Sequence, residues 1–277
     1  MKKDPLSRLL WFLVWGSAIL TAALVAVLIG FVLIRGIPHL RASLFSWTYT
    51  SENVSLLPSL INTLAMTALA LAAAVPLGVG AAVYLTEYAK RGNRLVGIIR
   101  LTSETLAGIP SIVYGLFGMI FFVDTLGLGL SLLSGAATMA VMVLPLMMRT
   151  TEEALHSVPD SFREGSFGLG AGRLRTIFRI VLPPAVPGIL SGVILSVGRV
   201  VGETAALLYT AGTVASLPEN LFSSARTLSV HMYTLAGEGL HVDEAYATAV
   251  VLLGLVVLIN GLSALAAGKW KKGGGHG

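Results

Sequence analysis

Cysteine is missing from the 277 residues of this chain, which excludes disulfides, thiolate metal sites and cysteine-ligated iron–sulfur clusters. Charged residues are scarce as well: they make up 12% of the chain, against about 25% in ordinary soluble domains. Hydrophobic residues, in contrast, account for 55%. This balance is typical of an integral membrane protein.

Two binding motifs are also missing. The net charge is +5, but the basic residues are spread between apolar segments and form no patch interleaved with aromatic residues, so the sequence gives no sign of nucleic-acid binding. The phosphate-loop pattern GxxxxGK[ST] is not present, because Gly268 and Lys269 are followed by Trp270 and lack the earlier glycine. We therefore expect no enzymatic ATP hydrolysis by this chain and no cofactor bound to it.

Six apolar segments are long enough for a helix that crosses a hydrocarbon core, which takes about 20 residues. The first of them runs unbroken for about 26 residues, longer than the core of a signal peptide, so we expect it to be retained. The sequence therefore predicts an all-α, polytopic membrane protein with six transmembrane helices. The predicted spans are 9–34, 60–84, 106–123, 130–148, 185–208 and 247–267.

Lysine and arginine residues gather before the first span and after the second, fourth and sixth. Because short loops rich in these residues remain in the cytoplasm, both termini and the loop 149–183 are predicted to be cytoplasmic in the cell inner membrane. The loop 209–245 then lies outside, and its apolar stretch 228–235 favours a re-entrant or surface-lying helix. His231 and His241 fall in this loop without carboxylates at ligand spacing, so we expect surface residues rather than a metal site.

The most informative segment is the charged run 163–183, REGSFGLGAGRLRTIFRIVLP, between two apolar spans. Pro159 suits the first turn of a helix and Asp160 favours its positive end, so a short helix is predicted as far as Phe167. Gly168 and Gly170 then permit a turn. A second helical segment follows, with apolar residues at Leu174, Ile177, Phe178 and Val181, and Pro183-Pro184 is expected to stop it.

This hairpin carries, in order, Glu164, Gly165, Ser166, Gly170, Ile180, Leu182 and Pro183. That spacing resembles the EAA loop of ABC importer permeases. The resemblance implies that a cytoplasmic ATPase docks on the loop and that Pro159 and Arg163 belong to the same coupling element. Judged by charge alone, the hairpin would instead be a solvated, positive-inside loop.

The fifth predicted span contains a basic and an acidic residue. A charge at mid-membrane costs at least about 2.5 kcal/mol, so some partner must offset it. Arg199 and Glu203 are four residues apart on a helix and are predicted to pair. One narrow stripe of small and polar side chains would face protein or water, and it comprises Gly188, Gly192, Ser196, Arg199 and Glu203.

The third span and its entry repeat this arrangement. Pro110 interrupts the backbone hydrogen bonds beside a second stripe. The two stripes together would line one cavity for a substrate. The alternative is that their small residues only let helices pack closely. The second stripe comprises Glu104, Gly108, Ser111, Gly115 and Gly118.

Two further segments narrow the resemblance to one type of ABC importer permease. LAGIPSIVYGLFG at 106–118 and GRVVGETAALLYTAG at 198–212, together with the hairpin, resemble the phosphate ABC importer permeases of the PstA type. The resemblance covers most of 60–267 and implies that Arg199, Glu203 and Arg149 take part in anion translocation. Arg149, at a helix end, is also explained as a topology signal. The chain departs from the family at Gly165-Ser166, where two alanines are usual, and in having no proline after GETA.

This resemblance implies an organisation and a set of partners. It places an N-terminal helix and outer segment in 1–59, a permease core in 60–268 and a flexible tail in 269–277. The implied partners are a second permease of the PstC type, an ATPase dimer of the PstB type that binds ATP-Mg, and a phosphate-binding protein of the PstS type. Alternatives are a sulfate or molybdate permease, a proton-coupled transporter in which Glu104 and Glu203 titrate, and a non-transporting sensor subunit.

Overall fold

The computed structural model describes residues 5–90 and 92–273, and these residues form helices and turns without a β-strand among them. The all-α prediction is therefore confirmed. Five of the helices are long and apolar enough to cross a membrane, and a sixth crossing is possible if one bent helix pair counts as a single span. The long helices are α1 (Pro5–Gly36), α2 (Leu57–Val83), α5 (Leu132–His156), α8 (Leu182–Gly202) and α11 (Val242–Gly273).

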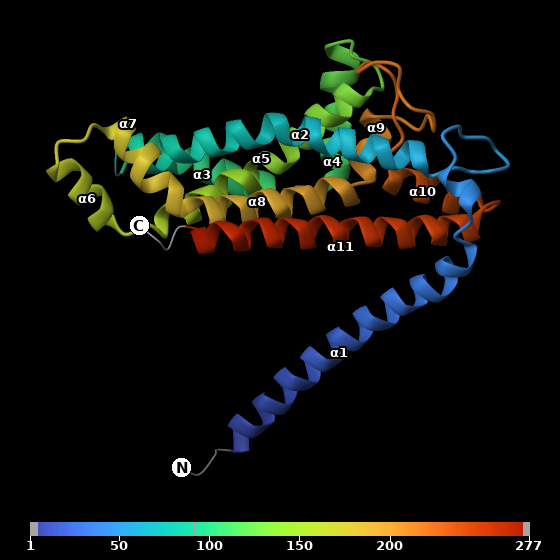
Figure 1. The fold of residues 1–277 in the computed structure, drawn as a ribbon, viewed down its shortest axis with the longest axis horizontal. Helices are drawn as coiled ribbons and strands as arrows, with labels where there is room; N and C mark the ends of the chain where they lie inside the picture. Colours follow the sequence, from blue (N-terminus) through green and yellow to red (C-terminus); the bar gives the residue numbers. More distant parts are fainter. Residues whose placement is uncertain (1–4, 91, 274–277) are drawn as a thin grey trace.

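Four of these helices form a bundle, with α2, α5, α8 and α11 side by side along the long axis (Figure 1). The first helix, α1, diverges from the bundle and meets α11 only near its C-terminal end, where the rings of Phe31 and Tyr246 lie 5.8 Å apart. None of its most apolar stretch is buried. The N-terminal helix thus stands apart from the bundle over most of its length.

The bundle core is packed with methionine and alanine side chains. Met66 and Ala70 of α2 and Met139 and Met142 of α5 have no exposed surface. Gly78 lets the two backbones approach, since a Cβ atom there would lie 2.7 Å from the Cβ of Met147. These small and flexible side chains allow α2 and α5 to pack closely.

The third predicted span is not one straight helix. It consists of α3 (Arg94–Ala107) and the segment 111–125, which meet at an angle of 103°. The bend falls at Gly108 to Pro110, because the proline has no N–H to continue the ladder. The second part is α4 (Ser111–Gly118), which continues as the π-helical turn η4 (Met119–Thr125).

The fifth predicted span begins earlier and ends earlier than expected. Pro183 and Pro184 do not stop the preceding helix. They lie in the first turn of α8, where a missing N–H is tolerated, and the wide π-helical turn η5 before them joins the segments into one helix over 173–202. The helix ends at Gly202, and a separate short helix begins at Ala205. The elements concerned are α7 (Arg173–Thr176), η5 (Ile177–Val181) and α9 (Ala205–Thr210).

The two ends of the bundle carry different structures. One end holds α7 and the short helix α6 (Asp160–Gly168), and the other holds α9 and α10 (Leu228–Glu238) (Figure 1). The helix predicted near 228–235 is therefore present. The flexible tail expected over 269–277 is not found as far as Gly273, because α11 stays helical to that residue, and the rest of this prediction, 274–277, lies outside the described residues.

His231 corrects a further expectation. The sequence predicts a surface residue, but His231 has no exposed surface in α10. Its Nδ1 atom lies 3.4 Å from a terminal nitrogen of Arg226, and its ring faces Tyr49 edge-on at 6.1 Å. Burial and the Arg226 charge lower the pKa of His231 to about 4. The residue is a neutral packing element of this end of the bundle.

Candidate functional site

A cavity of about 190 Å³ lies between α3, α5 and α8. It brings together three of the residues predicted to line a pathway, Glu104 from α3, Arg149 from α5 and Arg199 from α8. These positions are far apart in sequence, and only the packing of the three helices makes them neighbours. The remaining lining residues are Arg100, Ser103, Ala107, Pro145, Leu146, Met148 and Glu152.

Arg199 is half-buried in the last turn of α8. Within residues 5–90 and 92–273 its side chain has no ion pair and no hydrogen bond. A guanidinium group carries five N–H donors in a planar fork. Those donors are therefore available to a ligand in the cavity.

The predicted Arg199–Glu203 ion pair is not present among the described residues. The reason is that α8 ends at Gly202, and Glu203 has an extended backbone with φ −73° and ψ 131°. Its carboxylate turns away to the start of α9, where Oε1 accepts a hydrogen bond of 3.2 Å from the N–H of Ala206. Glu203 caps a helix instead of facing the cavity.

Four of the five glycines in the two small-residue stripes serve close helix packing. A Cβ atom on Gly115 would lie 2.8 Å from the Cα of Ala206, and one on Gly188 would lie 2.6 Å from the Cβ of Ala154. Ser111 starts α4 beyond the 103° bend and does not line the cavity. The continuous stripe predicted for the third span is wrong, because the bend divides it.

Arg149 makes an ion pair with Glu153, with 3.0 Å between Nε and Oε1, and both side chains are mostly exposed. Exposed pairs of this kind contribute little free energy, so Glu153 does not hold Arg149 strongly. Arg149 lies within α5, which continues to His156, so the predicted helix end is wrong, and its side chain lines the cavity.

Sequence reasoning missed two residues of the cavity, Arg100 and Glu152. Their Nε and Oε2 atoms lie 3.1 Å apart, and the Glu152 side chain is only 13% exposed. Their spacing could have indicated this position. Arg100 precedes Glu104 by four residues and Glu152 follows Arg149 by three, and residues at such spacing share a helix face.

The hairpin predicted for coupling is present. Pro159 precedes the first turn of α6, which ends at Gly168, one residue later than predicted. Gly170 makes the turn with φ +78°, a conformation that favours glycine. The hydroxyl groups of Ser166 and Thr176 lie 2.8 Å apart and connect α6 to α7.

A groove of about 550 Å³ runs between α6 and the α7–η5 segment. Of the predicted coupling residues, Gly165, Ser166, Gly170 and Ile180 line it. Apolar side chains are exposed beside them, with 51% of Phe162 and 91% of Leu169 accessible. An exposed apolar surface of this kind is a candidate for contact with another protein.

The other predicted coupling residues have different surroundings. Glu164 is exposed on α6, and Pro183 is exposed in the first turn of α8. Leu182 packs against the buried cluster that includes Leu155 and Val181. Arg163 turns inward, away from the groove. The hairpin therefore has an outer face for contact and an inner face attached to the bundle.

A bundle of membrane-length helices with an arginine-lined cavity and an exposed helical hairpin at one end defines a polytopic membrane permease. The chain belongs to the family of binding-protein-dependent transport system inner membrane components, and its residues 74–270 match the sequence pattern of that family. It is a permease subunit of an ABC importer, and thus a multi-pass protein of the inner membrane.

Individual relatives agree with this family. The probable ABC transporter permease protein YqgI of Bacillus subtilis (strain 168) is 35% identical over 263 residues, which cover 87% of this chain and 88% of that protein. The phosphate transport system permease protein PstA 1 of Mycobacterium tuberculosis (strain CDC 1551 / Oshkosh) is 38% identical over 205 residues, 73% and 67% of the two chains.

Among solved structures, a chain of the inward-facing MetNI methionine ABC transporter superposes with a TM-score of 0.62 at 22% identity. The superposition covers 78% of this chain and 95% of that one. At this identity the likeness concerns the fold alone. It agrees with the helical bundle described above.

Proposed function

We propose that this permease moves inorganic phosphate into the cell. The observation that carries the proposal is the guanidinium group of Arg199, which faces the cavity with all its donors available. Arg100 and Arg149 line the same cavity, so three arginines outnumber the two glutamates, Glu104 and Glu152. Guanidinium groups bind phosphate oxygens through paired hydrogen bonds. The name of the mycobacterial relative supports the same substrate.

The energy source in this proposal is a separate ATPase subunit. It docks in the groove of the α6–α7 hairpin, which lies on the cytoplasmic side by the positive-inside rule, with both termini on the same side. Closure of an ATPase dimer pushes α6 and changes access to the cavity, by analogy with the rocking of transporter halves. A second permease and an extracytoplasmic phosphate-binding protein complete the importer, and the family description supports the binding protein.

The test is phosphate uptake by proteoliposomes that hold the complete importer. Arg199→Ala and Arg199→Lys are compared with wild type, and ATP hydrolysis is followed in the same vesicles. Loss of a charge-assisted contact predicts that uptake falls roughly 10- to 100-fold for Arg199→Ala. Arg199→Lys keeps the charge but not the planar fork, so its uptake is expected to lie between those of wild type and Arg199→Ala.

A matched control is Arg41→Ala, because Arg41 is exposed and lies outside the cavity. Its uptake stays at the wild-type level. Uptake that survives Arg199→Ala would show that this arginine is structural. If wild-type vesicles import sulfate or molybdate in preference to phosphate, the protein is still a permease, but the proposal of phosphate as its substrate is wrong.

A further inference from the structure

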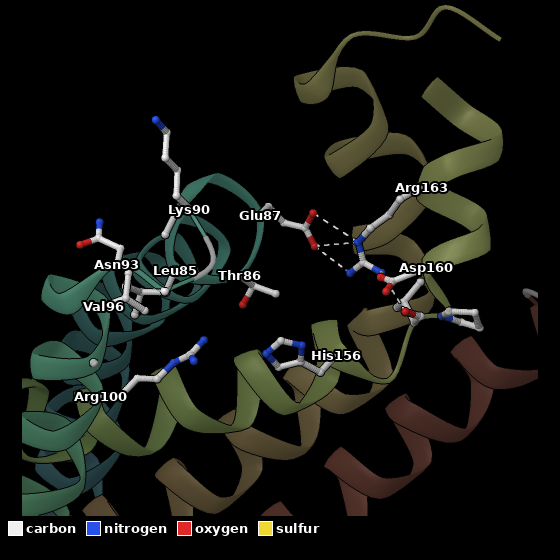
Figure 2. A pocket seen from close by; sticks show the side chains of 15 residues that line it. Leu85, Thr86, Glu87, Lys90, Asn93, Val96, Arg100, His156, Asp160 and Arg163 are labelled. Carbon is white, nitrogen blue, oxygen red and sulfur yellow. Dashed lines mark hydrogen bonds and ion pairs between the residues drawn. The ribbon is translucent and has the colours of Figure 1, made fainter. Parts of the chain in front are cut away.

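We propose that Glu87 is the receiving partner of the coupling helix α6, and that its ion pair with Arg163 transmits movement of α6 to the end of α2. Glu87 lies in the π-helical turn η3 (Tyr84–Tyr88), which closes α2. The two side chains face each other across the end of the bundle (Figure 2). This inference rests on the proposed function, since it requires that a partner acts on α6.

The pair is short and shielded from solvent. The Arg163 terminal nitrogen Nη2 lies 2.7 Å from Oε1 of Glu87, and Nε lies 3.1 and 3.3 Å from the two carboxylate oxygens. Only 14% of the Arg163 side chain and 9% of the Glu87 side chain are exposed. Screening by water and salt is weak at such a site, so the attraction is strong and directional.

The remaining donors of Arg163 bind a second element. Nη2 donates to the carbonyl oxygen of Leu155 at 3.0 Å, and Nη1 donates to that of Val158 at 2.8 Å. Both carbonyls lie at the C-terminal end of α5 and in the link to α6. One rigid, planar group therefore joins α6 to the ends of two membrane helices, α2 and α5.

Little else attaches α6 to α2. Of the α6 residues, all of which the structure describes, Ser166 alone is buried, and its hydroxyl contact is with α7. Beside the ion pair lies a cavity of about 570 Å³, lined by η3, the start of α3, the end of α5 and the start of α6 (Figure 2). A packed apolar core does not hold α6 against α2 here, so Arg163 provides the direct connection.

Of the two helices that Arg163 reaches, α5 lines the candidate pathway, and α2 packs against α5. The most extensive helix packing in the bundle is between α2 and α5 and between α5 and α8. These last two carry Arg149 and Arg199. If α6 moved without α2, Glu87 would remain as a buried and uncompensated charge, which is unfavourable. A displacement of α6 is therefore expected to move α2 and α5 with it, and with them the cavity wall.

The first test is Glu87→Gln in the complete importer, with phosphate imported per ATP hydrolysed as the readout. The variant keeps the side-chain size and loses the charge. Because Glu87 is shielded from the docking groove, the ATPase still copurifies and hydrolyses ATP. Imported phosphate per ATP falls about tenfold, the factor expected for one charge-assisted hydrogen bond. Glu52→Gln, an exposed carboxylate distant from the hairpin, leaves the ratio unchanged.

The second test uses the absence of cysteine from the chain. The double variant Glu87→Cys and Arg163→Cys has only two thiols, and a short flexible bismaleimide can join them. The unlinked protein hydrolyses ATP with little import, and the linked protein regains import. Each single-cysteine variant treated with the same reagent controls for alkylation. A purely stabilising role would change the thermal midpoint without restoring the ratio on linkage.

Two results would overturn the inference: a wild-type ratio in Glu87→Gln, or a ratio that linkage of the two thiols does not improve. Failure of the proposed function is a separate result. It would appear in the wild-type protein as missing ATPase copurification or as missing ATP-dependent phosphate uptake.

Discussion

Arg100 of α3 and Glu152 of α5 form an ion pair that lies between two cavities. The Nε and Oε2 atoms are 3.1 Å apart, and Arg100 lines both the 190 Å³ cavity beside Arg199 and the 570 Å³ cavity beside Arg163. Glu152 lines only the former, and its second oxygen is buried without a hydrogen-bond partner in the described part of the chain. The pair therefore holds two helices together at the border of the candidate pathway.

Arg100→Ala is expected to destabilise the protein, because it leaves the shielded carboxylate of Glu152 without a partner. The loss should be about 1–3 kcal/mol in the free energy of unfolding. The measurement is thermal unfolding of the purified chain in detergent. Arg149→Ala is the matched control, since the Arg149–Glu153 pair is mostly exposed and contributes at most about 1 kcal/mol. Equal losses for the two variants would contradict the burial argument.

Gly115→Ala should disturb the contact between α4 and α9. An added Cβ would lie 2.8 Å from the Cα and 3.2 Å from the carbonyl oxygen of Ala206, and backbone atoms cannot move aside cheaply. We expect a loss of about 1–3 kcal/mol, measured by thermal unfolding. Gly254→Ala in α11 is the control, because a Cβ there meets no atom within 4 Å. A stable Gly115→Ala protein would show that the two helices adjust.

Leu169→Asp should weaken docking of the ATPase. Leu169 is 91% exposed at the groove between α6 and η5, and a carboxylate there cannot be buried in an apolar contact. The expected result is at least a roughly tenfold loss of copurified ATPase, since an interface anchor contributes about 1–2 kcal/mol or more. Leu240→Asp makes the same change at an 82% exposed leucine at the opposite end. It should not alter copurification.

His231 should make stability depend on pH. Its pKa is about 4 in the folded protein and about 6.5 in an unfolded chain, so the unfolded state binds more protons between these values. Stability is therefore full above about pH 6.5 and falls as the pH drops towards 4, by up to about 3 kcal/mol. Thermal midpoints from pH 7 to pH 4 measure this loss. His231→Gln, which does not titrate, should flatten the slope, and an unchanged slope would exclude His231 as its source.

Hydropathy and local signals were sufficient for much of the architecture. Long apolar runs must become helices in a membrane, because lipid offers no partners for backbone N–H and C=O groups. For this reason four predicted spans lie within or nearly within α1, α2, α5 and α11. Pro159 and Gly170 acted locally too, one before the first turn of α6 and the other in the turn that follows it. Such effects need only neighbouring residues, so the sequence by itself determined them.

Tertiary structure decided the pairings. Sequence spacing paired Arg199 with Glu203, but α8 ends between them and the carboxylate caps α9. His231 looked like a surface residue, but it is buried with Tyr49 and Arg226. Both predictions were wrong, because residue spacing does not show where α8 ends or which face of α10 is buried.

Glu87 and Arg163 are 76 positions apart in the chain, and no local spacing pairs them. Periodicity reports which side chains share a face of one helix, and it holds no information about which faces of different helices meet. That choice depends on close packing of glycine, alanine and methionine side chains throughout the bundle. The sequence by itself therefore determined the helices and the hairpin, and only the packed structure decided which charges lie together, because those contacts join residues distant in sequence.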